Sequence, residues 1–120
     1  MTKHELDEIK QNLHTQLLEL ESQGEMTALD IRNIEQNHTD PTDQASFDEV
    51  MNMKLRIRDR ESKLINKILL ALERIKQGEF GICETCEEDI PLKRLMARPV
   101  TTSCIECKSK EEQKARASSF

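Results

Sequence analysis

Two long stretches with helical spacing of apolar residues constrain this chain more than any other feature of its sequence. In the first, five aliphatic residues recur at intervals of three and four: Leu6, Ile9, Leu13, Leu17 and Leu20. Such spacing places them on one stripe of a helix. A second stretch of the same kind follows a short polar segment at residues 40–45 and runs to Gly78. Two helices of similar length joined by a short turn predict a mainly α fold built on a long antiparallel two-helix coiled coil.

Polar residues mark the limits of the first helix. Thr2 and Glu5 have the spacing of a capping box, which predicts that the helix begins there. Gly24 lies inside the helical stretch, where a glycine costs about 1 kcal/mol relative to alanine. The apolar pattern resumes beyond it at Leu29, Ile31 and Ile34. We therefore expect the helix to continue through Gly24 and to end near Asn37.

The second helix is expected to stop at Gly78, because glycine is a common residue just past a helix C-terminus. Ser46 and Glu49 offer a further local cap near its start. Its apolar positions are Phe47, Val50, Met51, Met53, Ile57, Leu64, Ile65, Ile68, Leu69, Leu72 and Ile75. They are densest between residues 64 and 75. The helix interface should therefore be thicker at that end than near the turn.

The polar segment between the helices contains a strong helix-start signal. An aspartate such as Asp40 can cap free amide groups, and a proline such as Pro41 loses no hydrogen bond at a first helical position. The carboxylates of Asp40 and Asp43 should then lie together at a helix N-terminus, where the helix dipole favours negative charge. We expect an exposed tip at residues 38–46.

Composition leaves little material for a thick globular core. Of the 120 residues, 34% are charged and 2% are aromatic, so a thin core supplemented by a metal is expected. The longest apolar run, residues 68–72, is too short to span a bilayer. The first residues show no targeting segment. The prediction is a cytoplasmic protein without membrane contact.

Charge is segregated along the chain. Residues 1–45 include 3 basic and 10 acidic residues, and residues 46–76 include 8 basic and 5 acidic residues. Residues 77–120 include 7 basic and 8 acidic residues. An acidic first helix and a basic second helix attract each other, whereas the acidic total charge of the chain argues against a nucleic-acid binder.

The second helix also carries a basic stripe: Arg56, Arg60, Lys63 and Lys67. This stripe fits either a solvated face paired with acids of the first helix or a docking face for an acidic surface or a phosphorylated ligand.

The four cysteines form two C-x-x-C pairs, Cys83 with Cys86 and Cys104 with Cys107, separated by 17 residues. This spacing is typical of a tetrahedral zinc site. A redox pair is the alternative, but the thioredoxin type needs a βαβ pattern that the sequence lacks. We expect one structural Zn²⁺ per chain.

A second capping box, Ser103 with Glu106, predicts that a short C-terminal helix begins at the second cysteine pair.

Several motifs together resemble the DksA/TraR family of transcription factors. They are D-P-x-D-x-A at residues 40–45, L-R-x-R-D-R-E-x-K-L-I at residues 55–65, F-G-x-C-x-x-C at residues 80–86 and A-R-P at residues 97–99. The similarity covers roughly residues 37–110 in the family's order and spacing. It implies a bacterial, non-enzymatic, monomeric protein that binds RNA polymerase without sequence-specific DNA binding. The coiled coil would enter the secondary channel toward the catalytic centre.

The resemblance also implies roles for individual residues. The tip that modulates the polymerase active centre matches Asp40, Asp43 and Ala45, and the contact with the channel rim matches Arg60, Leu64 and Lys67. The family's site for the alarmone ppGpp maps onto Asn37, Leu64, Lys67, Arg98 and Lys108. The three cations of that set suit phosphates. The chain departs from the family in lacking most of the N-terminal segment of longer members and in having Gln44 where a basic residue is common.

Three functions follow from these observations. The favoured function is a regulator of transcription initiation that acts with ppGpp by changing the stability of open complexes. The first alternative is a transcript-cleavage-type factor, whose tip acids hold a metal ion at the polymerase active site. The second alternative is a zinc-ribbon module that binds nucleic acid, which the acidic charge disfavours. We expect a coiled-coil domain at residues 1–78 and a zinc-finger region with the C-terminal helix at residues 79–120.

Overall fold

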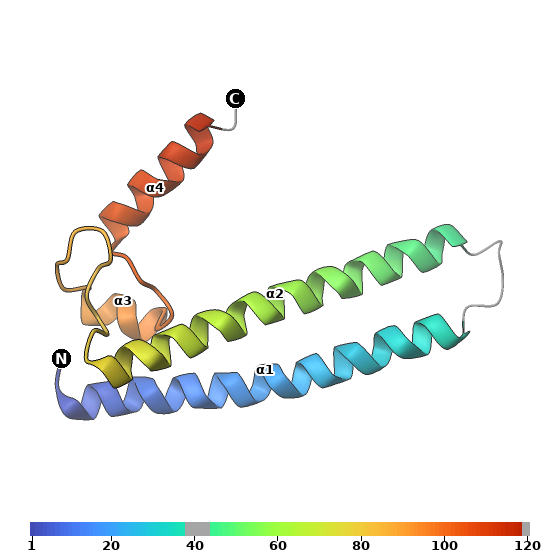
Figure 1. The fold of residues 1–120 in the computed structure, drawn as a ribbon, viewed down its shortest axis with the longest axis horizontal. Coiled ribbons are helices and arrows are strands. Elements are labelled where there is room, and N and C mark those ends of the chain that lie inside the picture. Colours follow the sequence, from blue (N-terminus) through green and yellow to red (C-terminus); the bar gives the residue numbers. More distant parts are fainter. Residues whose placement is uncertain (38–43, 119–120) are drawn as a thin grey trace. The chain divides into compact units, whose positions relative to one another are not determined.

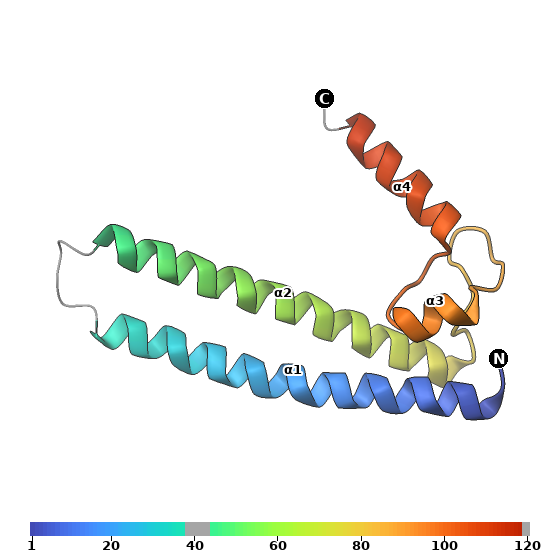
Figure 2. The ribbon, with the colours of Figure 1, turned by 180° about the vertical axis from the view of Figure 1, so that it is seen from behind.

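The structure is a computed structural model that describes residues 1–37 and 44–118 (Figure 1). Its helices are α1 (Lys3–Asn37), α2 (Gln44–Gln77), α3 (Leu92–Ala97) and α4 (Ile105–Ser118). The two long helices α1 and α2 pack together and run in opposite directions, as both views show (Figures 1 and 2). This confirms the predicted mainly α fold with two long packed helices and a short C-terminal helix. Within the described ranges, no helix is long and apolar enough to cross a membrane.

The described chain forms two compact units. The zinc-finger unit comprises residues 1–13 and 68–120, and the hairpin unit comprises residues 14–67. Each unit contains part of α1 packed against part of α2. Both long helices thus contribute to both units. The predicted division into domains 1–78 and 79–120 concerns independent folding and stays a prediction.

In the hairpin unit, the α1 side of the helix interface follows the alternation of three and four residues typical of a coiled coil. Its buried or half-buried positions are Leu17, Leu20, Gly24, Thr27, Ile31 and Ile34, with Ala28 and Asp30 half-buried beside them, and those of α2 are Phe47, Met51, Lys54, Glu61 and Ile65. Two of the α2 residues are charged. The ammonium group of Lys54 lies 3.2 Å from the Asp30 carboxylate of α1. This ion pair is the kind of attraction that the charge segregation predicted.

Several apolar residues within the two helical patterns are exposed: Leu29, Val50, Met53, Ile57, Leu64 and Leu69. An apolar residue in such a pattern therefore need not face the other helix, and the exposure of Leu64 is compatible with its predicted contact with the polymerase rim. A pair of helices buries only a narrow stripe of each partner. Residues to the side of that stripe remain in contact with water.

The core of the zinc-finger unit joins the helices to the segment that follows them. Its buried aliphatic residues are Ile9 and Leu13 of α1, Ile68 and Ala71 of α2, and Ile90 and Leu95. The buried residues of α2 thus fall between positions 64 and 75, as the sequence predicted for the thicker end. Leu95 belongs to α3, a short helix that the sequence analysis did not predict.

The predicted capping box is present at the start of α1. The amide of Glu5 donates to Thr2 Oγ1 at 3.2 Å, and the amide of Thr2 donates to Glu5 Oε1 at 3.1 Å. Hydrogen bonding of the carboxylate with the Thr2 side chain and with the Thr2 amide lowers the pKa of Glu5. The prediction that α1 continues through Gly24 to Asn37 is also confirmed.

Gly78 terminates α2, as predicted, in a Schellman arrangement. Its φ of 77° lies in the left-handed region, where glycine has no steric penalty. The amide of Gly78 donates to the carbonyl of Ile75 at 3.2 Å, and the amide of Glu79 donates to that of Arg74 at 2.9 Å. Two otherwise free carbonyls of the last turn are therefore satisfied.

The start of α2 differs from the prediction in one respect. The helix is already formed at Gln44, whose side-chain amide donates to Asp48 Oδ1 at 2.9 Å. Ser46 therefore lies within the first turn and does not begin the helix. The predicted helix start at Asp40 and Pro41 lies outside the described residues.

Candidate functional site

The four cysteine sulfurs form one cluster in the zinc-finger unit. All four Sγ atoms lie within 4.8 Å of one another, and those of Cys86 and Cys104 are 3.9 Å apart. A tetrahedral zinc site with Zn–S bonds of about 2.3 Å requires sulfurs about 3.8 Å apart. The donor set and its spacing therefore fit zinc. Four thiolates complete the coordination, so the site is structural and has no position for a catalytic water.

A tight turn presents the first pair of cysteines. The amide of Cys83 donates to the Glu88 carbonyl at 2.8 Å, and the amide of Glu87 donates to the Cys83 carbonyl at 3.0 Å. Glu87 adopts a left-handed φ of 61° to close this turn. An antiparallel bridge between Ile82 and Asp89 joins its two ends. The turn is thus held by backbone hydrogen bonds, with Cys83 buried and Cys86 exposed.

The second pair lies at the N-terminus of α4. The amide of Lys108 donates to the Cys104 carbonyl at 2.9 Å, so Cys104 occupies the N-cap position and Cys107 lies in the first turn. The predicted capping box was one residue out of register, because α4 begins at Ile105 and Ser103 precedes the cap. The predicted C-terminal helix itself is confirmed.

Backbone amides directed at sulfur favour the thiolate of Cys83. Hydrogen bonds from the amides of Cys86 and Cys104 lower the pKa of Cys83 to about 6, and the Cys104 amide lies 3.4 Å from its sulfur. The pKa of Cys107 is raised to about 12, mainly because of its interaction with the Cys104 thiol and because of burial. A bound cation would hold all four groups as thiolates.

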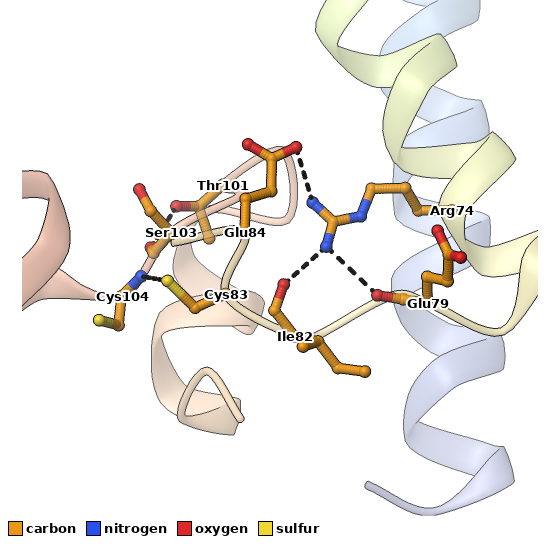
Figure 3. A network of polar contacts seen from close by, with 8 residues as sticks. All are labelled: Arg74, Glu79, Ile82, Cys83, Glu84, Thr101, Ser103 and Cys104. Atoms are coloured by element: carbon orange, nitrogen blue, oxygen red, sulfur yellow. Dashed lines mark hydrogen bonds and ion pairs between the residues drawn. The ribbon is translucent and has the colours of Figure 1, made fainter. Parts of the chain in front are cut away.

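Arg74 of α2 ties the first turn of the finger to the long helix (Figure 3). Its Nη2 atom donates to the carbonyls of Ile82 at 2.6 Å and Glu79 at 3.3 Å, and its Nη1 atom lies 3.5 Å from Glu84 Oε1. The side chain is only 18% exposed. Sequence analysis missed this role, because its only signal was a basic residue in the last turn of a helix.

Arg94 of α3 holds the irregular segment that leads to Cys104. It donates to the Ser103 carbonyl at 3.1 Å and to Thr101 Oγ1 at 3.2 Å, while Thr101 Oγ1 donates to the Ser103 carbonyl at 3.0 Å. Thr101 and Ser103 are drawn beside the cysteines in Figure 3. A sequence signal existed in the run of helix-forming residues at 92–97 after Pro91. It was not used.

The residues predicted to contact the polymerase rim lie on α2 within the hairpin unit. Arg60, Leu64 and Lys67 follow one another at intervals of four and three, so they share one side of the helix, and all three are exposed. Lys63 of the same basic stripe pairs with Asp59 of its own helix at 3.0 Å. Among residues 1–37 and 44–118, no ion pair joins this stripe to α1.

The five residues predicted to bind ppGpp are distributed over both units. Leu64 and Lys67 lie on α2 in the hairpin unit, and Asn37 is the last residue of α1. Arg98 is the C-cap residue of α3, and Lys108 lies in the first turns of α4, both exposed in the zinc-finger unit. Their assembly into one binding site stays a prediction.

The predicted tip lies almost entirely outside the described residues. This applies to both acids, Asp40 and Asp43. Ala45 is described and is exposed in the first turn of α2. Its position in the first turn of α2 is compatible with a tip role, which stays a prediction.

Two long packed helices together with a four-cysteine zinc finger define a class of small zinc-finger proteins. The family model for the N-terminal domain of the DnaK suppressor protein DksA matches residues 5–75. The model for the prokaryotic dksA/traR C4-type zinc finger matches residues 78–113. The chain belongs to the DksA/TraR family.

Individual relatives agree with this assignment. The RNA polymerase-binding transcription factor DksA of Buchnera aphidicola is 38% identical over 93% of this chain and 74% of its own length. The protein of the same name from Escherichia coli strain K12 is 35% identical over the same shares. The solved structure of transcription factor DksA2 from Pseudomonas aeruginosa is 37% identical, with a TM-score of 0.87 over 97% of this chain and 89% of that chain.

Proposed function

We propose that this protein binds RNA polymerase and regulates transcription initiation in the cytoplasm. The observation that carries the proposal is the similarity to curated relatives named RNA polymerase-binding transcription factors, which extends over 93% of the chain. The similarity includes both the hairpin and the zinc finger, so it covers the parts that would bind and orient the protein.

The hairpin would enter the secondary channel with residues 38–46 leading. Arg60, Leu64 and Lys67 form an exposed side of α2 that offers two cations and one aliphatic side chain to the channel rim. Such a surface suits an acidic partner with an apolar contact at its centre. The negative charges of Asp40 and Asp43 would then act near the catalytic centre.

We further propose that ppGpp binds through Lys67, Arg98 and Lys108, with Asn37 and Leu64 completing the site. Guanidinium and ammonium groups form charge-assisted hydrogen bonds to phosphate oxygens. On this view the three cations supply the positive charge that the phosphates of the alarmone require.

The substitution Asp43→Asn tests the proposal, since it removes a charge at nearly constant shape. Regulation of a responsive promoter should collapse at saturating protein, while affinity for polymerase remains and stability changes by at most about 0.5–1 kcal/mol. The matched control is Glu49→Gln, which neutralises an exposed acid in the first turns of α2 and should keep full regulatory activity. Full regulation by Asp43→Asn would contradict an active tip.

The same acids keep one alternative open, a factor of the transcript-cleavage type. An assay on stalled elongation complexes separates the two functions. A regulator of initiation should leave the RNA 3′ end intact, whereas a cleavage factor should shorten the transcript in a Mg²⁺-dependent manner.

A further inference from the structure

A groove in the zinc-finger unit lies between the last turns of α2 and the first cysteine turn. It has a volume of about 670 Å³, and both Leu70 of α2 and Ile82 of the finger line it. Leu70 is 62% exposed and Ile82 is 37% exposed. Neither side chain contributes to the buried core of its unit. The groove therefore presents aliphatic surface that the described chain leaves in water.

The walls of this groove are acidic. Four glutamates line it, namely Glu73, Glu79, Glu84 and Glu87, against a single cation, Arg74. The guanidinium of Arg74 already interacts with the finger, because it donates hydrogen bonds to two backbone carbonyls and lies 3.5 Å from the Glu84 carboxylate. Glu73 accepts a hydrogen bond from the neutral Gln77 at 3.1 Å. Three carboxylates thus remain without a compensating charge from the lining residues.

Apolar surface at the centre and negative charge around it define the partner that would fit. The partner must supply an aliphatic or aromatic side chain to cover Leu70 and Ile82, and lysines or arginines to meet the glutamates. Nucleic acid is excluded by the sign of the charge. A basic amphipathic protein segment satisfies both requirements.

We propose that this groove docks a basic amphipathic segment of RNA polymerase, an inference that rests on the function proposed above. It would form a second contact, opposite in charge to the basic side of α2 that carries Arg60 and Lys67. Two contacts of opposite charge admit only one orientation of the protein on its partner. The zinc finger would then contribute to binding directly and would not serve only to hold the helices.

The test compares Leu70→Glu with Leu69→Glu in binding of the full-length protein to purified core polymerase. Both leucines are exposed on α2, but only Leu70 lines the groove. Leu70→Glu should weaken binding roughly ten-fold or more, and Leu69→Glu should stay within about two-fold of the unaltered protein. Equal zinc content and equal helical circular dichroism would show that both variants fold.

Charge is tested separately by the double variant Glu73→Gln with Glu87→Gln, which leaves the Arg74 to Glu84 contact intact. Its affinity for polymerase should fall and should depend less steeply on salt than that of the unaltered protein. The matched control is Glu112→Gln on α4, which lies outside the groove and should change neither quantity. An unchanged salt dependence in the double variant would overturn the proposal.

A photo-crosslinking residue at position 70 identifies the occupant. We expect it to capture a polymerase peptide rich in lysine or arginine, and capture of a second copy of this chain would overturn the proposal. If the unaltered protein does not bind polymerase, the proposed function fails and this inference fails with it. If the unaltered protein binds and Leu70→Glu binds as tightly as Leu69→Glu, only the groove inference fails.

Discussion

Gly24 of α1 and the Glu61 carboxylate of α2 occupy the same layer of the helix interface. A Cβ atom at position 24 would lie 3.7 Å from Glu61 Oε2. Thr27 Oγ1 lies 3.5 Å from Glu61 Oε1 and donates more closely, at 2.9 Å, to the Gln23 carbonyl. Within the described residues, Glu61 Oε2 is buried without a hydrogen-bond partner. The hairpin unit therefore contains a polar layer in an otherwise mostly apolar interface.

This layer leaves room for a methyl group at position 24. Gly24→Ala should increase the free energy of unfolding by about 0.5–1 kcal/mol, because alanine is the better helix former and its Cβ would meet Glu61 at an ordinary contact distance. Urea unfolding followed by circular dichroism measures the change. The contrasting variant is Gly78→Ala, which should destabilise the protein, since φ is 77° at that position. A loss of stability in Gly24→Ala would show that the layer is tighter than described.

Arg74 should be essential for attachment of the finger. Arg74→Ala removes charge-assisted hydrogen bonds to the Ile82 and Glu79 carbonyls, and should destabilise the finger by about 1–3 kcal/mol. Arg74→Lys should restore little of this stability, since one ammonium group cannot replace a planar guanidinium that donates to several acceptors. The readout is the rate of zinc transfer to a coloured chelator, which should rise. Lys76→Ala, at an exposed position of the same turn, should leave that rate unchanged.

Removal of zinc should unfold the finger while sparing most of the helical hairpin. Helices α3 and α4 contain 6 and 14 residues, against 35 and 34 in α1 and α2. Chelation should therefore remove at most about one quarter of the helical circular dichroism, because metal binding supplies folding free energy only where the ligands lie. Elemental analysis of the untreated protein should give one zinc per chain. Complete loss of helix on chelation would contradict the predicted division between residues 1–78 and 79–120.

The predicted phosphate-binding cations can be separated from general charge effects. Lys67→Ala or Arg98→Ala should weaken the response to ppGpp about ten-fold, since charge-assisted hydrogen bonds contribute roughly 1.5–3 kcal/mol each. Binding to polymerase without ppGpp should change less. Lys63→Ala, on α2 with Lys67, and Lys93→Ala, on the helix α3 that Arg98 caps, remove exposed charges nearby and serve as controls. An undiminished ppGpp response in both test variants would exclude this site.

Local signals were sufficient for the features that depend on neighbouring residues. The capping box of Thr2 and Glu5, the stop at Gly78 and the course of α1 through Gly24 all follow from interactions within one or two helical turns. The zinc ligands were predictable for a related reason: a metal imposes its own geometry, and two closely spaced cysteine pairs suffice to meet it. The family motifs added the regulatory residues, whose roles await the experiments above.

Tertiary structure decided which residues of each helix meet a partner. The sequence shows Val50, Met53 and Leu64 as apolar but not that they lie beside the interface, because the facing surface of α1 determines the width of the buried stripe. It shows Glu61 as charged, yet the space beside Gly24 places its carboxylate inside. Arg74 and Arg94 resemble ordinary surface cations until folding brings carbonyls of the segments that follow their helices within reach. Contacts between segments far apart in the chain depend on the shape of both partners, and a local pattern describes only one of them.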